Sequence, residues 1–170
     1  MKKLFMLLAA VVLTVGAYAQ KTAFVNTELI FRSIPEYTKA MEDLDALAVT
    51  FQSQIDAEYD RIAEMYDRYQ FQKANLSESA RKEVEENIIS REKQMEEKQA
   101  GYFGNDGELM KKRLELLKPI QDRVFGAIDN LSKSRNYDVV IDIANNASLV
   151  YYNQSLDIST EILRALGINK

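Results

Sequence analysis

The sequence predicts an α+β fold that is mostly α, with a long antiparallel helical hairpin inserted in a small β-sheet body. Apolar residues recur at steps of three and four over most of the chain, which is the spacing of one stripe along a helix. Short β-branched segments occur only near the two ends of the chain. Because so small a sheet has exposed edges, we also expect partner subunits to cover them.

Residues 1–19 are typical of an export signal. Lys2 and Lys3 precede an apolar stretch from Leu4 to Val15, and Ala17-Tyr18-Ala19 is a small-x-small cleavage site. The apolar stretch is shorter than the roughly 20 residues that span a bilayer. We therefore expect an exported protein that is cleaved after Ala19, rather than a membrane anchor.

The composition disfavours an enzyme. The chain has no cysteine and no histidine, so it holds neither a Ser-His-Asp nor a Cys-His nucleophile, nor a Cys/His zinc site. Asp142, Asn145 and Asp157 are the remaining candidate calcium ligands. Their spacing matches no known calcium loop, so capping and turn roles are favoured. We expect no metal and no cofactor.

The charge is concentrated in the middle of the chain. The net charge is −4, and residues 36–112 carry 11 Lys and Arg against 18 Asp and Glu. Nucleic acid is therefore disfavoured as a partner, because Lys and Arg contacts to phosphates dominate that affinity.

The N-terminal half predicts a strand, a short helix and the outgoing helix of the hairpin. The strand covers 22–26 and the short helix 27–34. Pro35 fits the first position of the long helix, which should run to about Lys73. Its apolar stripe is Tyr37, Met41, Leu44, Ala48, Phe51, Ile55, Tyr59, Ile62, Tyr66 and Tyr69. The stripe breaks at a turn over 75–78, where Ser77 is the expected cap of the return helix.

The return helix carries a sparser stripe. Its members are Val84, Ile88, Met95, Tyr102, Leu109, Leu116, Ile120, Val124, Ala127 and Leu131. Between 81 and 98 the pattern is that of a solvated surface, with pairs such as Glu92 and Glu96 with Lys93 and Lys98. Gly101, Gly104 and Gly107 weaken the helix. Because the seven-residue step continues through them, we expect a weakened or kinked helix and a hinge, not a separate loop. Pro119 is a candidate second bend.

The C-terminal end returns to β structure. Residues 137–142 predict one strand, 145–146 a turn and 149–152 another strand. Asp157 is the expected cap of a terminal helix, 158–166, which stops at Gly167. The resulting boundaries are a β-rich body of 20–34 and 120–170, and a coiled-coil arm of 35–119.

Both ends of the chain resemble the Skp/OmpH family of periplasmic holdase chaperones. The similar segments are Lys21-Thr22-Ala23-Phe24-Val25-Asn26 with Leu29-Ile30-Phe31, Tyr137-Asp138-Val139-Val140-Ile141-Asp142, Val150-Tyr151-Tyr152-Asn153 and Asp157-Ile158-Ser159-Thr160. The resemblance implies a homotrimer in which strands of three chains form a trimerisation body. It also implies three helical arms around a cavity that captures unfolded outer-membrane β-barrel proteins in the periplasm without ATP. The acidic arms depart from the basic arms of the family and disfavour membrane contact.

On this interpretation three groups of residues have predicted roles. The client-binding candidates are Met65, Phe71, Met95, Tyr102 and Phe103, since methionine and aromatic side chains adapt to varied apolar partners. The trimer-interface candidates are Phe24, Val25, Val139, Ile141, Val150 and Tyr151. The hinge candidates are Gly101, Gly104 and Gly107. The alternative function is a structural coiled-coil adaptor of the cell envelope, which would bridge two partners through defined surfaces.

Overall fold

The structure is a computed structural model that describes residues 20–144 and 146–168. The predicted export signal and the turn residue Asn145 lie outside the described residues. The described residues divide into two compact units, the first of residues 20–30, 125–144 and 146–168 and the second of residues 31–124.

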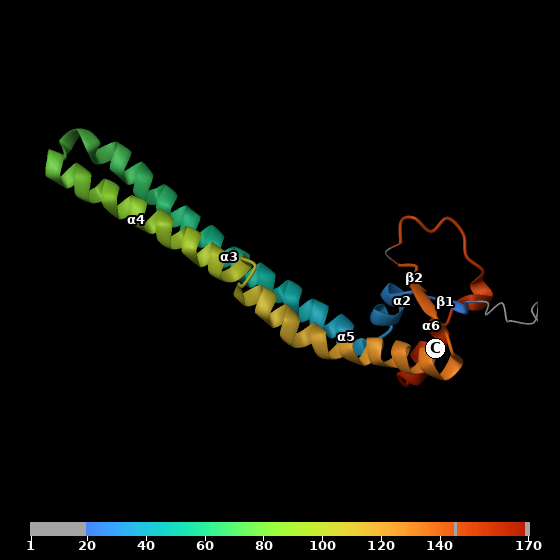
Figure 1. Ribbon diagram of the computed structural model, residues 1–170. Helices are drawn as coiled ribbons and strands as arrows, with labels where there is room; N and C mark the ends of the chain where they lie inside the picture. Colours follow the sequence, from blue (N-terminus) through green and yellow to red (C-terminus); the bar gives the residue numbers. More distant parts are fainter. Residues whose placement is uncertain (1–19, 145, 169–170) are drawn as a thin grey trace, which may run out of the picture. The chain divides into compact units, whose positions relative to one another are not determined.

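The first unit contains a two-stranded parallel sheet made from the two ends of the chain. Strand β1 (Thr22–Val25) pairs with β2 (Val139–Asp142), and Phe24 lies opposite Ile141. Figure 1 shows the two strands, far apart in sequence, side by side. The predicted strand at 149–152 is wrong, because this segment is irregular and only a single bridge joins Phe24 to Asp157.

Helices α2 (Thr27–Arg32) and α3 (Pro35–Gln72) follow the first strand. Pro35 stands at the first turn of α3 as predicted, where its missing N–H costs nothing. The carboxylate of Glu36 has a lowered pKa, chiefly because of a hydrogen bond from its own backbone N–H and then because of Arg123. Negative charge is favourable at this end of a helix.

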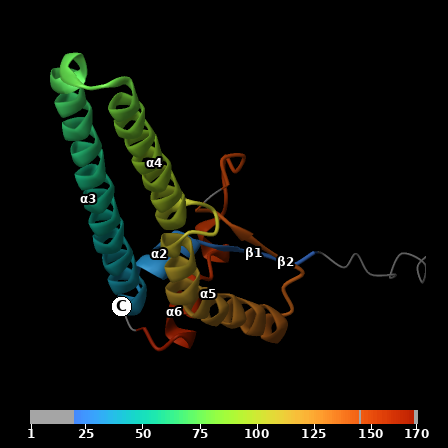
Figure 2. The same ribbon diagram turned by 90° about the vertical axis from the view of Figure 1, so that its left-hand side faces the viewer.

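The second unit contains a helical hairpin. Helix α3 ends in the 3-10 turn η1 (Lys73–Asn75), and α4 (Glu78–Phe103) runs back along α3, as both views show (Figures 1 and 2). Ser77 caps α4 as predicted, since its hydroxyl accepts a hydrogen bond of 3.3 Å from the Ala80 N–H. The hairpin therefore begins and ends at signals that the sequence carries locally.

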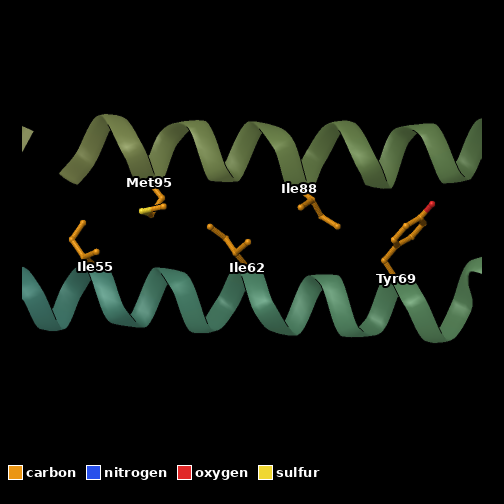
Figure 3. Close-up of a cluster of buried hydrophobic side chains, with 5 residues drawn as sticks. All are labelled: Ile55, Ile62, Tyr69, Ile88 and Met95. Carbon is orange, nitrogen blue, oxygen red and sulfur yellow. The ribbon is translucent and has the colours of Figure 1, made fainter. Parts of the chain in front are cut away.

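The two helices of the hairpin pack through a narrow seam. Figure 3 shows its five buried side chains between the helices, and they are Ile55, Ile62, Tyr69, Ile88 and Met95. On each helix the buried residues recur every seven positions, so one side chain in every two turns packs against the other helix. Tyr59 and Tyr66, which the stripe also included, are each 48% exposed. The seam is thus narrower than the predicted stripe.

The glycine segment separates two helices. Helix α4 ends at Phe103 and α5 (Glu108–Arg135) begins after four intervening residues, visible as the yellow loop in Figure 2. The expectation of a continuous, weakened helix is therefore wrong. A Cβ on Gly107 would lie 2.7 Å from the Tyr102 carbonyl oxygen, so the tight turn itself requires glycine there. Pro119 lies inside α5, which continues past it.

Two helices end in the same backbone motif. At the end of α5, Asn136 has a φ of 53°, and the Tyr137 N–H donates to the Ser132 carbonyl at 3.0 Å. At the end of α6 (Ser159–Ala165), Gly167 has a φ of 79°. Both are left-handed terminations of the Schellman type, and only the glycine one was predicted. No helix among the described residues is both long and apolar enough to cross a membrane.

Candidate functional site

The hairpin carries exposed apolar side chains outside its seam. On α3 and α4 these are Val49, Tyr59, Tyr66, Phe71, Ile89 and Phe103. Phe71 is 88% exposed, next to the turn at the end of the hairpin. Isolated exposed apolar residues are ordinary, but a series of them along one pair of helices is typical of an interaction surface.

The predicted client-binding residues occupy three different environments. Met95 is buried in the seam, and Met65 is half-buried against the same cluster. Phe71 and Phe103 are exposed. Their binding roles stay a prediction, and the geometry favours the exposed members because a client can reach them without opening the hairpin.

Tyr102 belongs to an aromatic cluster at the end of α4. Its ring stacks on Phe51 with centroids 4.1 Å apart and planes 3° apart, and Phe103 contacts Phe51 edge-on at 6.1 Å. The Tyr102 hydroxyl donates a 2.6 Å hydrogen bond to the Gln54 side chain. This cluster anchors the last turn of α4 to α3 immediately before the glycine turn.

A hollow of about 410 Å³ lies near the turn of the hairpin. Its apolar lining consists of Met65, Leu76, Ala80 and Val84, and its polar lining consists of Arg68, Tyr69, Gln72, Glu83 and Asn87. The Tyr69 hydroxyl donates a short hydrogen bond to Glu85 on α4. This bond raises the pKa of Tyr69, because it is lost when the hydroxyl ionises. The hollow is open and suits contact with a side chain rather than enclosure of a small molecule.

The predicted interface residues of the sheet are divided between buried and exposed positions. Val25 is buried within the chain, whereas Val139 and Ile141 are half-buried. Phe24 packs against Tyr152 with ring centroids 5.1 Å apart. Val150 and Tyr151 are 98% and 82% exposed, on the segment that forms no strand. The assignment of these residues to a trimer interface therefore stays a prediction. Val150 and Tyr151 are apolar side chains that other parts of the described chain do not bury.

Asp142 and Asp157 accept hydrogen bonds at the starts of helices, in keeping with the capping and turn roles favoured above, although the N-cap position of α6 is Ile158 and not Asp157. Asp142 accepts hydrogen bonds from the Thr27 N–H at 3.2 Å and the Thr27 hydroxyl at 2.6 Å, at the start of α2. Asp157 accepts from the Ser159 N–H at 2.8 Å, at the start of α6. Among residues 20–144 and 146–168, no three metal-binding side chains cluster together. Asn145, the third calcium candidate, lies outside the described residues.

The sequence did not identify Tyr59, Tyr66 and Ile89 as surface residues. The 3-4 pattern assigned both tyrosines to the seam, but a seam of one residue per seven leaves them at its edge. One signal was present: the step from Ile55 to Tyr59 is a second consecutive step of four, which moves the stripe off the seam.

Comparisons with known proteins agree with this architecture. A protein-family model described as "Outer membrane protein (OmpH-like)" matches residues 21–166. No curated protein matches the chain. The fold is similar to a crystal structure of a candidate outer membrane chaperone (OmpH-like) from Caulobacter crescentus, with a TM-score of 0.65 at 11% sequence identity. That match covers 89% of this chain and 86% of the other chain. At this identity the likeness establishes the fold, a mostly helical chain with a long hairpin and a small sheet.

Proposed function

This chain belongs to the OmpH-like family of outer membrane proteins, and on that premise we propose that it is an ATP-independent periplasmic holdase chaperone. In this proposal three chains form a homotrimer, and their arms enclose a cavity that binds unfolded outer-membrane proteins and prevents their aggregation. Residues 1–19 direct export. The protein is not an enzyme, since a holdase needs only to cover apolar surface.

The observation that carries this proposal is the hairpin with exposed apolar side chains on both of its helices. Tyr66 and Phe71 on α3 and Ile89 on α4 are exposed next to a buried seam, and Val49 is exposed nearer the start of α3. Many separate apolar contacts of this kind each contribute a small free energy, roughly 25 cal/mol per Å² of apolar surface covered. Such contacts hold a client without imposing one geometry on it.

The open edge of the sheet supports the homotrimer. Within the described residues, β2 pairs with β1 on one side only, and Val150 and Tyr151 nearby in sequence are exposed. An unpaired strand edge beside exposed apolar residues favours pairing with another chain. Sedimentation of the mature chain should give the mass of three copies, and Tyr151→Asp should shift the mass toward that of one chain. A stable monomer before mutation would contradict the trimer.

Light scattering tests the chaperone activity. An unfolded outer-membrane β-barrel protein is diluted from urea with and without an equal concentration of trimer. We expect the trimer to suppress aggregation over the whole time course. Unchanged scattering, together with one tight and saturable partner in the envelope, would favour the structural adaptor instead.

A further inference from the structure

One face of the hairpin combines exposed apolar side chains with carboxylates. A hollow of about 240 Å³ between α3 and α4 is lined by Tyr66, Gln70, Lys73, Ile89 and Glu92, together with the seam residues Tyr69 and Ile88 and with Glu85. Tyr66 is 48% exposed and Ile89 is 62% exposed, so both present apolar surface at the rim.

Helical spacing extends this face along the hairpin. Tyr59 stands seven residues before Tyr66 on α3, and Glu96 stands seven residues after Ile89 on α4. Residues seven apart lie on nearly the same side of a helix. The side-chain hydrogen bonds of Tyr69 with Glu85 and of Tyr102 with Gln54 give the antiparallel register, which brings Glu96 level with Tyr59. We call the set Tyr59, Tyr66, Ile89, Glu92 and Glu96 the tyrosine face.

The two carboxylates of the tyrosine face are outside the ion pairs of the described residues, and Lys73 in the same hollow lies over the Tyr69 ring instead. Glu92 and Glu96 form no ion pair in the part of the chain that the structure describes, although pairs with Lys93 and Lys98 were predicted. Lys93 pairs with Glu97 and Lys98 crosses to α3 on the other side of the seam. The predicted pairs are wrong because the lysines point away from this face.

The opposite face of the hairpin neutralises its charges internally. There a smaller hollow is lined by Glu58, Arg91, Gln94, Met95 and Lys98. The Glu58 carboxylate forms ion pairs with both Arg61 and Lys98, with N–O distances of 3.0 Å and 3.6 Å. The same pair of helices therefore has one face where the carboxylate of Glu58 is paired and one face where Glu92 and Glu96 are available to a partner.

We propose that the tyrosine face selects client segments in which Lys or Arg stands next to apolar side chains. This inference rests on the proposed function and names the chemistry of the client. A cation is attracted to the Tyr59 and Tyr66 rings and to the Glu92 and Glu96 carboxylates. The neighbouring apolar client side chains cover Ile89 and the hollow. Charge complementarity selects this occupant, because the face itself carries Glu92 and Glu96 and because residues 36–112 have 18 Asp and Glu against 11 Lys and Arg.

Two labelled peptides test the selection. They have equal length and equal Val and Tyr content, and one carries Lys where the other carries Glu. Fluorescence anisotropy at low ionic strength, where exposed charges are least screened, measures the affinity of the mature trimer for each. We expect the Lys peptide to bind about tenfold more tightly, as several partly exposed charge and cation–π contacts together would produce.

Matched variants locate the effect on the tyrosine face. Glu92→Gln with Glu96→Gln should weaken binding of the Lys peptide about fivefold, which corresponds to two exposed charge contacts. Glu86→Gln with Glu97→Gln makes the same change in net charge on the same helix, at exposed glutamates outside the hollows described above, and should leave binding unchanged. Tyr59→Leu with Tyr66→Leu keeps apolar contact and should reduce the preference for Lys. Circular dichroism confirms that each variant folds.

Three outcomes would overturn the proposal. The first is equal affinity for the Glu peptide and the Lys peptide. The second is an equal loss of binding in both pairs of glutamine variants, which indicates attraction to net charge alone. The third is that neither pair of glutamine variants changes the affinity for the Lys peptide. Each of these results is compatible with full suppression of aggregation, so failure of the selection is distinguishable from failure of the chaperone activity.

Discussion

The sheet unit and the hairpin are stabilised by different kinds of contact. In the sheet unit, hydrogen bonds join residues more than a hundred positions apart, such as Asn26 to Ser159 at 2.7 Å and Lys21 to Asp138 at 2.7 Å. In the hairpin, a single row of buried side chains recurs at intervals of seven. Directional bonds specify one geometry, whereas a repeated apolar row is satisfied by many similar sequences. The difference suits a fixed body and an adaptable arm.

The largest effect should come from the hairpin seam. Ile55 is 1% exposed, and Ile55→Ala should lower the free energy of unfolding by about 3 kcal/mol, since it leaves a cavity in the narrow buried seam. Urea unfolding followed by circular dichroism measures the change. Hydrogen exchange should show the loss of protection concentrated in α3 and α4.

The matched control is Val49 on the same helix. Val49 is exposed, so Val49→Ala should change the free energy of unfolding by less than about 0.5 kcal/mol. Equal effects at the two positions would mean that Val49 is covered in the assembled protein, and the seam as described would not account for the stability of the hairpin.

In the sheet unit the largest expected effect is that of Asp142. Asp142→Ala removes the acceptor for the Thr27 N–H, the Thr27 hydroxyl and the Ala144 N–H, and should cost about 2 kcal/mol. Thr27→Val removes only the hydroxyl bond and should cost less. Thermal unfolding at one fixed protein concentration measures both. If Thr27→Val lowers the stability more than Asp142→Ala does, the threonine side chain and not the Asp142 carboxylate stabilises this end of α2.

The glycine segment should respond in opposite directions at two nearby positions. A Cβ at Gly101 meets nothing within 4 Å, so Gly101→Ala should stabilise α4 by about 1 kcal/mol. A Cβ at Gly107 meets backbone at 2.7 and 2.9 Å, so Gly107→Ala should destabilise by about 1–3 kcal/mol. Unfolding in urea gives both values. If capture of a client is also unchanged in both variants, the predicted hinge role is contradicted.

Local signals explain which parts of the fold the sequence predicts. Pro35, Ser77 and Gly167 each act within one turn of a helix, and each occupies its predicted role. The strand predicted at 149–152 depended on a partner edge, which a pattern of β-branched and aromatic residues does not supply. The left-handed Asn136 also went unpredicted, because asparagine adopts that conformation far less regularly than glycine.

The candidate site was harder to predict for a geometric reason. A 3-4 repeat defines a stripe about two residues wide, and the repeat does not say which of the two faces the partner helix. Ile62 and Tyr66 both belong to the stripe, but only Ile62 enters the seam. Packing of α4 against α3 decides between them, and this information lies in residues such as Ile88, far along the chain.

The smallest predicted effect is a pH dependence within the seam. The hydrogen bond to Glu85 raises the pKa of Tyr69, so the folded chain holds this proton more tightly than the unfolded chain. The stabilisation is fully present below the unfolded tyrosine pKa of about 10 and is lost as the pH rises through the higher folded value. The advantage of the native chain over Tyr69→Phe in urea unfolding should therefore shrink above about pH 10. A constant difference at every pH would show that the phenol contributes packing alone, and the seam would then be as purely apolar as its four other members.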